Sequence, residues 1–292
     1  MNETTTVLDR LVKLYPQAKK TTLREMVSSK RVKLNGELVK SLKQEVGASD
    51  TFEVTDSAAA PSKPTVMANG LRLVHMDSTV LIVDKPTGLL TSTDSQEKRP
   101  TVVKILNNYF QQVNSKNQIH LIHRLDRDAS GLLVLARTSE AYKALKEQFY
   151  EHTITRRYDV LVHGIPAKKQ GRLENLLVED EQTGVMRVVT DMKVGKLAIL
   201  DYVTVQVNEA KKVGHLQCTL YTGRKHQIRV QMKTMGHAVL ADRIYGVEEE
   251  EPGRLALHAS HLTFKHPGTH REVSFDSQMP GGFAHVMHGK GS

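Results

Sequence analysis

The sequence of 292 residues has a single cysteine, Cys218, and no long apolar run. One cysteine excludes an internal disulfide and a cysteine-rich zinc site, and it fits a reducing compartment. No stretch approaches the roughly 20 apolar residues that a membrane-spanning helix needs. The polar N-terminus also lacks the apolar core of a signal peptide. We therefore expect a cytoplasmic protein without a membrane partner.

Several catalytic motifs are missing as well. No glycine-rich loop has phosphate-cradling spacing, which argues against nucleotide hydrolysis. The 14 histidines include no HExxH motif and no set with metal-ligand spacing. No serine lies in a G-x-S-x-G context, so serine acyl transfer is not expected. We expect neither a metal nor another cofactor.

The charge, in contrast, is strongly biased. Lysine and arginine number 41 against 32 aspartates and glutamates, which gives a net charge of +9 and a pI near 9.5. This balance favours an anionic partner, of which nucleic acid is the commonest. With 39% hydrophobic residues the chain can bury a sizeable core. Its length suits one large domain or two smaller ones.

The clearest break along the chain is residues 55–70, "TDSAAAPSKPTVMANG". This stretch is rich in Ala, Ser and Pro and has no apolar period, which is typical of a linker. The break predicts a small domain at residues 1–54 and a large domain at residues 71–292.

The small domain is expected to contain two helices, a hairpin and a short final strand around "TFEV". Apolar residues at helical spacing predict a first helix that Pro16 ends. Thr22 and Glu25 have capping-box spacing and predict the start of the second helix. Asn35-Gly36 lies between short alternating runs, which indicates a hairpin because both residues tolerate positive φ.

A cluster of cations lies on and after the predicted second helix. One interpretation is a solvated helix face. However, residues 7–54 resemble, almost end to end, the S-four-type RNA-binding module first known from a ribosomal small-subunit protein. The usual Gly-Asp before the last strand is Ser49-Asp50 here. The resemblance implies contacts between these cations and the phosphate backbone of structured RNA. The cations are Lys19, Lys20, Arg24, Lys30, Arg31 and Lys33.

The large domain shows mainly the patterns of strands. Two apolar runs lie between residues 71 and 86, and a continuous run at 131–138 indicates a strand buried on both faces. One helix is predicted, with Ser139 as its cap. Alternation predicts two further strands, one with Val203, Val205 and Val207 and one with Leu216, Cys218 and Leu220.

The stretch "LIHRLDRDAS" at residues 121–130 places Asp126 and Asp128 among cations, just before the apolar run. An aspartate beside arginines is expected to have a lowered pKa and to stay ionised. Such a group suits a nucleophile or a base and disfavours a general acid. The alternative is a surface salt-bridge cluster of little energetic value.

A second cation-rich stretch, "TLYTGRKHQIRVQM" at residues 219–232, lies beside an expected strand. If the two stretches meet at strand ends, Arg229 could pair with a carboxylate of the first. Sites often form at such loop positions.

Five segments together resemble the motifs of the RluA-type pseudouridine synthases, in the order of that family. The N-terminal module is itself common there. The resemblance implies an α+β fold, with a mixed, largely antiparallel central sheet flanked by helices and loops. The segments are "VLIVDKPTGLLT" at 80–91, "HRLDRDASGLLVLA" at 123–136, "RRYDVLVHG" at 156–164, "TGRKHQIRVQMKTMGHAVLADRIYG" at 222–246 and "LHASHLTFKHP" at 257–267.

The resemblance also implies roles at the reacting base. Asp126, the aspartate of "HRLD", would attack or activate the target uridine so that its glycosidic bond breaks. The freed uracil would turn and rejoin the ribose through carbon five. Tyr158 would stack on the base and could take the proton from carbon five. Arg229 would pair with Asp126 and keep it ionised, whereas Asp128 would only order the loop.

Further roles follow from the same resemblance. Arg124 would fill the place that the flipped base leaves in the RNA, and Lys85 and Pro86 would line the base pocket. Departures from the family pattern are few, and none removes a proposed catalytic group. They are Ala129 in place of Thr, Gln231 in place of His and Ala241 in place of Gly.

The implied reaction is an isomerisation, which needs no metal, redox cofactor or second substrate. The implied substrate is large-subunit ribosomal RNA, with transfer RNA as the alternative, and the family suggests a monomer. Two other function classes remain: a noncatalytic RNA-binding or assembly factor on the same fold, and a hydrolase that releases a base without rejoining it.

Overall fold

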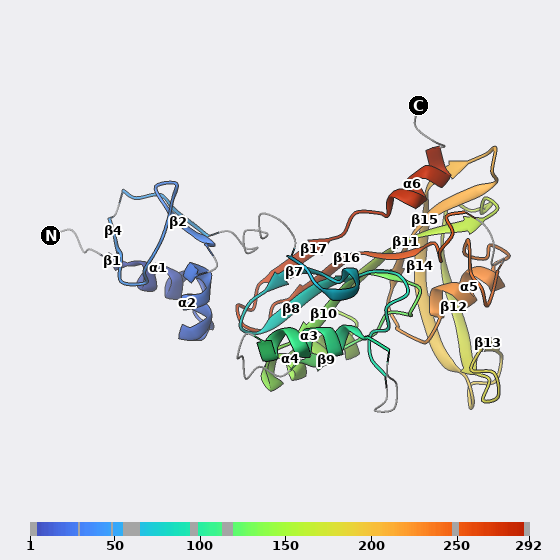
Figure 1. Ribbon diagram of the computed structural model, residues 1–292, viewed down its shortest axis with the longest axis horizontal. Helices are drawn as coiled ribbons and strands as arrows, with labels where there is room; N and C mark the ends of the chain where they lie inside the picture. The colour runs from blue at the N-terminus through green and yellow to red at the C-terminus, as the bar shows by residue number, and fades with distance from the viewer. Residues whose placement is uncertain are drawn as a thin grey trace.

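Two groups of secondary structure elements follow one another along the chain in the computed structural model (Figure 1). An N-terminal unit of short helices and strands precedes a 12-stranded sheet. Among the described residues, no helix is both long and apolar enough to cross a membrane. The structure describes residues 5–28, 30–47, 49–54, 65–93, 99–112, 119–246 and 251–288.

The N-terminal unit has the predicted order of helix, helix, hairpin and strand. Its apolar side chains form a cluster of their own, which includes Leu11, Leu23 and Val32. Asn35 and Gly36 both have positive φ, 53° and 82°, as the hairpin prediction requires. The elements are β1 (Thr5–Thr6), α1 (Val7–Leu14), α2 (Lys20–Ser28), β2 (Val32–Leu34), β3 (Glu37–Leu38), β4 (Glu45–Val46) and β5 (Phe52–Val54).

The capping box predicted at Thr22 and Glu25 is wrong. Thr22 lies inside α2 and is buried. The capping box of this unit is at α1, where Asp9 accepts from the Thr6 N–H at 2.9 Å and Thr6 accepts from the Asp9 N–H at 3.3 Å. Glu25 instead accepts a hydrogen bond from the backbone N–H of Ser78, outside the unit.

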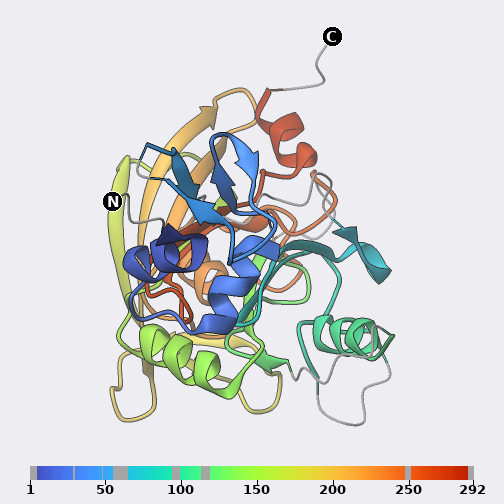
Figure 2. The same ribbon diagram turned by 90° about the vertical axis from the view of Figure 1, so that its left-hand side faces the viewer.

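Two turns at one end of the large sheet contact the N-terminal unit, which faces the viewer in Figure 2. Ser78 in the β7–β8 turn reaches Glu25 of α2. Arg271 in the β16–β17 turn donates to the Leu14 carbonyl at 2.9 Å, and its guanidinium lies 3.9 Å from the centre of the Tyr15 ring. The unit therefore rests on the sheet through polar and cation–π contacts.

The large sheet confirms the predicted α+β class. Its strand order is β13-β12-β14-β15-β11-β16-β10-β8-β7-β6, with β17 added to β16 and β9 to β10. Every pairing is antiparallel except that of β10 with β16. The strands are β6 (Thr65–Val66), β7 (Arg72–Met76), β8 (Val80–Lys85), β9 (His120–Leu121), β10 (Ser130–Ala136), β11 (Thr155–His163), β12 (Gln170–Glu179), β13 (Met186–Val189), β14 (Lys196–Asn208), β15 (Val213–Leu220), β16 (Leu257–Lys265) and β17 (Glu272–Asp276).

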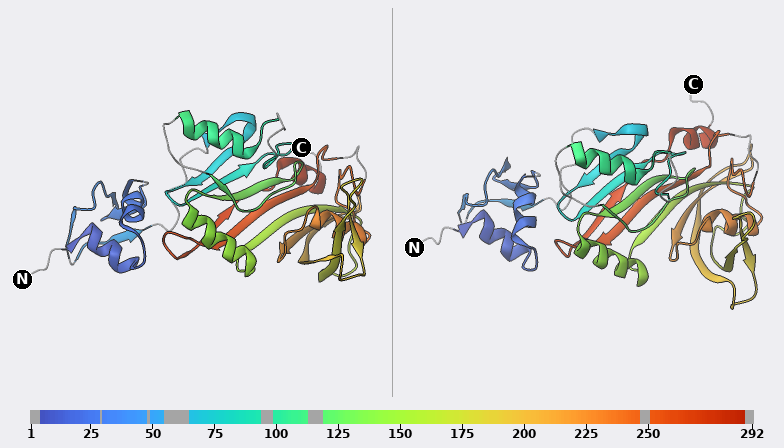
Figure 3. Two further views of the ribbon diagram at one scale, coloured as in Figure 1. Left: turned by 90° about the horizontal axis from the view of Figure 1, so that it is seen from below. Right: turned by 60° about the horizontal axis from the view of Figure 1, so that its bottom comes forward.

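Helices cover both faces of the central strands, as Figure 3 shows for α3 and α4. Leu133 of β10 belongs to the apolar cluster that contains α3 residues, whereas Leu132 and Val134 belong to the cluster that contains α4 residues. Successive side chains of a strand point to opposite faces, so β10 is buried on both sides as predicted. The helices are η1 (Ala68–Gly70), α3 (Val102–Gln112), α4 (Ser139–Tyr150), α5 (Gln227–Thr234) and α6 (Gly281–His288).

Three features of the secondary structure differ from the prediction. Thr138 rather than Ser139 caps α4, because its hydroxyl accepts from the Ala141 N–H at 3.1 Å. Residues 65–70 of the predicted linker form β6 and η1, while residues 55–64 lie outside the described ranges. Helix α5 was not predicted at all. The stretch after β15 turns at residues 223–226 and becomes helical, so Arg229 lies on a helix and not at a strand end.

The strand with Val203, Val205 and Val207 is present as β14, but these valines lie on its exposed face. The opposite face, with Leu200 and Tyr202, is buried. Alternation therefore predicted the strand correctly, while the choice of buried face depends on which side the rest of the molecule covers.

Candidate active site

A cavity of about 1450 Å³ opens in the sheet region, and most of its lining comes from four segments. The segments are the loop between β9 and β10, the C-terminal end of α4, the start of β11 and the connection from β15 to α5. Asp126 and Tyr158 both line this cavity. The two cation-rich stretches of the sequence thus meet in space.

Arg229 lies between two carboxylates. Its Nη1 donates to Oδ2 of Asp126 at 3.2 Å. Its Nε and Nη2 donate to the two oxygens of Asp242, both at 2.7 Å. The side chains of Arg229 and Asp242 are 5% and 0% exposed, whereas that of Asp126 is 23% exposed. The bidentate pair with Asp242 fixes the guanidinium plane, and the remaining edge is left for Asp126.

In the buried pair of Arg229 and Asp242, each charge favours the ionised form of the other residue. Burial raises the pKa of Asp242, but the hydrogen bonds and charge of Arg229 outweigh it and lower that pKa below its usual value. Burial lowers the pKa of Arg229, and its two carboxylate partners more than reverse this. Both groups therefore stay charged at neutral pH.

Asp242 is a site residue that sequence reasoning missed. Its Oδ1 also accepts the backbone N–H groups of Ile244 and Tyr245, at 2.9 and 3.0 Å. The one signal in the sequence was an aspartate directly after the apolar run "HAVLA", at capping distance from the next two amides. That pattern is common in ordinary turns, so it did not stand out.

The two aspartates of "HRLDRD" have different surroundings. Asp128 makes a bidentate pair with Arg127, with both contacts at 2.9 Å, and its carbonyl accepts from the Thr87 hydroxyl at 2.7 Å. Asp128 does not line the cavity, whereas Asp126 does. Arg229 is the ion-pair partner of Asp126 among the described residues. Asp126 is therefore the more available of the two carboxylates.

Tyr158 reaches the same cavity from β11. The pairing of β11 with β16 shifts register between Arg157 and Tyr158, which locally redirects the strand. Burial raises the pKa of Tyr158, the Arg156 charge opposes this, and the Asp126 charge adds to it. The net shift is upward, so Tyr158 is a neutral phenol at physiological pH. Within the described part of the chain, its hydroxyl has no hydrogen-bond partner.

Lys85 and Pro86 do not line the cavity, contrary to the prediction. The side chain of Lys85 is fully buried, and its ammonium donates to the carbonyls of Pro86, Leu89 and Arg127 at 2.9, 2.7 and 2.9 Å. Burial lowers its pKa to about 7. Three carbonyl acceptors use all three ammonium protons, so Lys85 ties the β8 end to the Asp126 loop and leaves no donor for a base.

The remaining residues that were predicted to contact RNA differ in how exposed their side chains are. Arg124 is exposed and lines the cavity. In the N-terminal unit, Arg24 and Lys30 are exposed and available to a partner. Arg31, however, is only 6% exposed, so its expected surface contact with RNA is not supported. It follows the left-handed Lys30 at the end of α2, where the chain turns inward.

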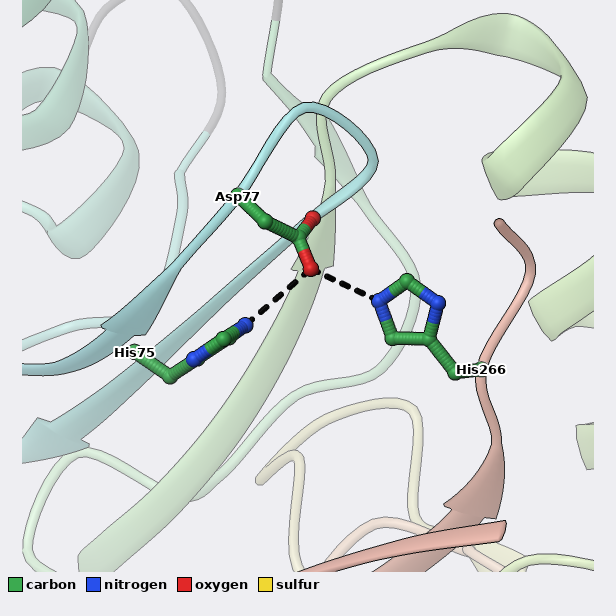
Figure 4. A group of neighbouring side chains, drawn as sticks. All are labelled: His75, Asp77 and His266. Atoms are coloured by element: carbon green, nitrogen blue, oxygen red, sulfur yellow. Dashed lines mark hydrogen bonds and ion pairs between the residues drawn. The ribbon is translucent and has the colours of Figure 1, made fainter. Parts of the chain in front are cut away.

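Three residues outside the cavity form a second polar cluster, which the sequence analysis did not bring together (Figure 4). Asp77 Oδ2 accepts from His75 at 3.1 Å and from His266 at 2.7 Å. His266 Nδ1 accepts the N–H groups of Gly268 and Thr269, at 3.0 and 3.1 Å, so its proton lies on Nε2. A metal at Nε2 would displace that proton, so these residues fit a hydrogen-bonded turn better than a metal site.

Comparison with known proteins agrees with this geometry. The family profile described as RNA pseudouridylate synthase matches residues 79–234, which include Asp126, Tyr158 and Arg229. This chain belongs to that family. The synthase is therefore an isomerase that acts on RNA.

Curated relatives cover almost the whole synthase. It is 32% identical to the ribosomal large subunit pseudouridine synthase D of Zymomonas mobilis, over 94% of this chain and 90% of the relative. It is 29% identical to the uncharacterized RNA pseudouridine synthase YlyB of Bacillus subtilis, over 92% and 88%. Among solved structures, human RNA pseudouridylate synthase domain containing 4 has a similar fold, with a TM-score of 0.61, 20% identity, and coverage of 74% of this chain and 91% of that chain.

Proposed function

We propose that the synthase converts specific uridines of large-subunit ribosomal RNA to pseudouridine in the cytoplasm, with Asp126 as the catalytic carboxylate. The observation that carries the proposal is the contact of Asp126, which lines the cavity, with the buried Arg229 behind it. The choice of RNA rests on the relatives named ribosomal large subunit pseudouridine synthase D, in Zymomonas mobilis, Neisseria meningitidis and Buchnera aphidicola.

The reaction requires the target base to leave its stack, because a side chain cannot reach the sugar and ring inside a helix. The cavity of about 1450 Å³ is large enough for an extruded nucleotide. RNA loops and bulges allow this at the lowest cost. Arg124, exposed at the cavity, would then occupy the space that the base vacates.

Asp126 would attack or activate the uridine so that the bond between nitrogen one and the ribose breaks. Arg229 would orient the carboxylate, with Asp242 holding the guanidinium from behind. The freed uracil would rotate, and its carbon five would bond to the ribose. The proton on carbon five must then leave.

Tyr158 would stack on the base and receive that proton. A phenol whose pKa is raised by burial is protonated at the start, so it can accept the proton only by passing its own onward. Nitrogen one of the product takes a proton, so the atoms balance without a cofactor.

Residues 1–54 would form a separate RNA-binding domain that adds affinity. Exposed Arg24 and Lys30 support this role, whereas buried Arg31 does not. Removing residues 1–54 should weaken RNA binding and reduce its salt dependence, since phosphate contacts dominate both. A salt series that leaves affinity unchanged would contradict the assignment.

The activity is tested with unmodified large-subunit ribosomal RNA that carries tritium at carbon five of uridine. Isomerisation displaces the label into water while the base stays attached. Release of free base would indicate a hydrolase, and binding without either event would indicate a noncatalytic factor. Repeating the assay with transfer RNA tests the choice of substrate.

A further inference from the structure

Arg156 is a buried cation in the wall of the cavity. It lies near the start of β11, two residues before Tyr158, and is 8% exposed. Among the described residues no carboxylate forms an ion pair with it, and burial lowers the pKa of its guanidinium. A buried charge without a counter-charge is costly. Its presence in a substrate cavity therefore calls for an explanation.

The hydrogen bonds of Arg156 use one edge of the guanidinium only. Nη2 donates to the carbonyls of Leu220, Tyr221 and Thr222, at 3.5, 3.2 and 3.3 Å. Nε has no partner, and Nη1 makes no hydrogen bond within the described part of the chain. The guanidinium lies 5.1 Å from the centre of the Phe149 ring, which holds it in place. Donors of the Nη1 group therefore remain unused.

Gly223 leaves space beside that unused nitrogen. A Cβ at this position would lie 2.9 Å from Nη1 of Arg156, so any larger residue would cover it. Gly223 lines the same cavity. The glycine and the arginine thus form an open donor position next to the candidate active site.

The cavity wall is also predominantly cationic. Asp126 and Glu179, two of its carboxylates, are paired with Arg229 and Lys225 respectively. An anion that enters would therefore meet more unpaired positive than negative charge. The cationic wall residues are Arg124, Arg127, Lys146, Arg156, Arg224 and Lys225, against the carboxylates Asp126, Glu147 and Glu179.

We propose that Arg156 and Gly223 form a phosphate subsite, which binds a phosphodiester group of the RNA strand that carries the target uridine. This proposal rests on the proposed function and identifies a contact within it. A phosphate oxygen would accept from Nη1 and supply the counter-charge that no described residue provides as an ion-pair partner. Because the contact is to the backbone, it positions the strand and does not read its sequence.

The alternative is a purely structural arginine that ties β11 to the Leu220–Thr222 carbonyls. Both roles predict a loss of stability when Arg156 is replaced. They differ in the salt dependence of RNA binding, because only a phosphate contact releases a counterion. They also differ at Gly223, where a methyl group blocks Nη1 and leaves the carbonyl contacts in place.

The test measures binding of an unmodified large-subunit ribosomal RNA transcript over a salt series. For Arg156→Gln we expect affinity to fall about tenfold and the slope of log K against log salt to decrease by about 0.7. Arg156→Lys should keep the slope, because the charge is retained. Gly223→Ala should reduce affinity and slope in the same direction, with a smaller loss of thermal stability than Arg156→Gln, because the Cβ displaces only the Nη1 end of the guanidinium. Lys169→Gln, an exposed cation outside the cavity wall, is the matched control.

An unchanged slope in both Arg156→Gln and Gly223→Ala would overturn the subsite. If Arg156→Gln fails to fold, Gly223→Ala alone decides. Wild-type tritium release on the same transcript separates this outcome from failure of the proposed function. A wild-type protein that isomerises the RNA, with variants of unchanged slope, would contradict only the role of Arg156.

Discussion

The synthase contains two three-residue polar clusters, one centred on an arginine and one centred on an aspartate. Beside the cavity, one buried cation, Arg229, lies between Asp126, which lines the cavity, and Asp242. At the other cluster, one anion, Asp77, lies between His75 and His266. The first opens to a large cavity, and none of the second group lines it.

The two clusters differ most in how fully their carboxylates are bonded. Asp77 Oδ2 binds both imidazoles, and its Oδ1 accepts from the Thr79 N–H, the Thr79 hydroxyl and the Val80 N–H at 2.8 to 2.9 Å. The Asp126 carboxylate makes one hydrogen bond with a described residue, to Arg229 at 3.2 Å. A saturated carboxylate stabilises a turn, whereas an undersaturated one beside a fixed cation is available to a substrate.

The largest expected effect is the loss of turnover in Asp126→Asn. The neutral amide cannot act as nucleophile or base, so tritium release should fall by at least about 1000-fold. RNA affinity, measured by filter binding, should stay near the wild-type value. Asp128→Asn is the matched control and should keep most activity, because Asp128 pairs with Arg127 outside the cavity. Wild-type turnover by Asp126→Asn would refute the assignment.

Asp242→Asn should affect both stability and activity. It leaves Arg229 buried with a weakened partner, and breaking a buried ion pair costs about 3–5 kcal/mol. The control is Asp201→Asn, because Asp201 makes a bidentate pair with Arg172 on the surface, at 2.7 and 3.0 Å. We expect that change to cost about 1 kcal/mol or less. If urea unfolding gave equal losses of unfolding free energy for the two variants, burial of the Arg229–Asp242 pair would have no special role.

Asp77→Asn should reduce the free energy of unfolding by about 2–3 kcal/mol at neutral pH, with turnover on folded protein unchanged. Burial raises the pKa of Asp77, but the two imidazoles more than reverse it and hold the pKa well below 3.8. A carboxylate whose pKa is lower in the folded state than in the unfolded state stabilises the fold at pH values above its unfolded-state pKa. This stabilisation is lost as the pH falls through the folded-state pKa. The difference in the free energy of unfolding between wild type and variant should therefore become smaller below about pH 4. A gap that widens with acid would contradict this role.

The smallest expected effect is the response to zinc. A metal that binds only the folded state raises the melting temperature. His266 uses Nδ1 as an acceptor for two amides, so its Nε2 carries a proton and is not free to ligate. We expect no shift of the melting temperature on addition of zinc to wild type. A rise of the melting temperature that is lost in His266→Gln would show that the second cluster binds zinc.

Local chemistry was predictable where one short stretch decides the structure. Asn35-Gly36 favours positive φ, and β10 has a continuous apolar run at residues 132–136, so both were correctly predicted. Prediction failed where several segments compete for a role. Thr22 had the spacing of a cap, but the chain enters α2 two residues earlier. Helix α5 was missed because polar residues alternate with apolar ones along it, which is the period of a strand and not of a helix. Residues of both kinds are buried: Gln227, Ile228, Arg229, Val230, Gln231 and Met232.

The sequence alone determined which residues could meet chemically: the "HRLD" carboxylate, the "HQIR" guanidinium and the motif order of the family. Only the tertiary structure decided the environment of each one. It buried Lys85 under three carbonyls, placed Asp242 behind Arg229, and gave Arg156 no ion-pair partner among the residues that the structure describes. The physical reason is that burial and partner choice depend on segments far apart in the chain, which no local pattern encodes.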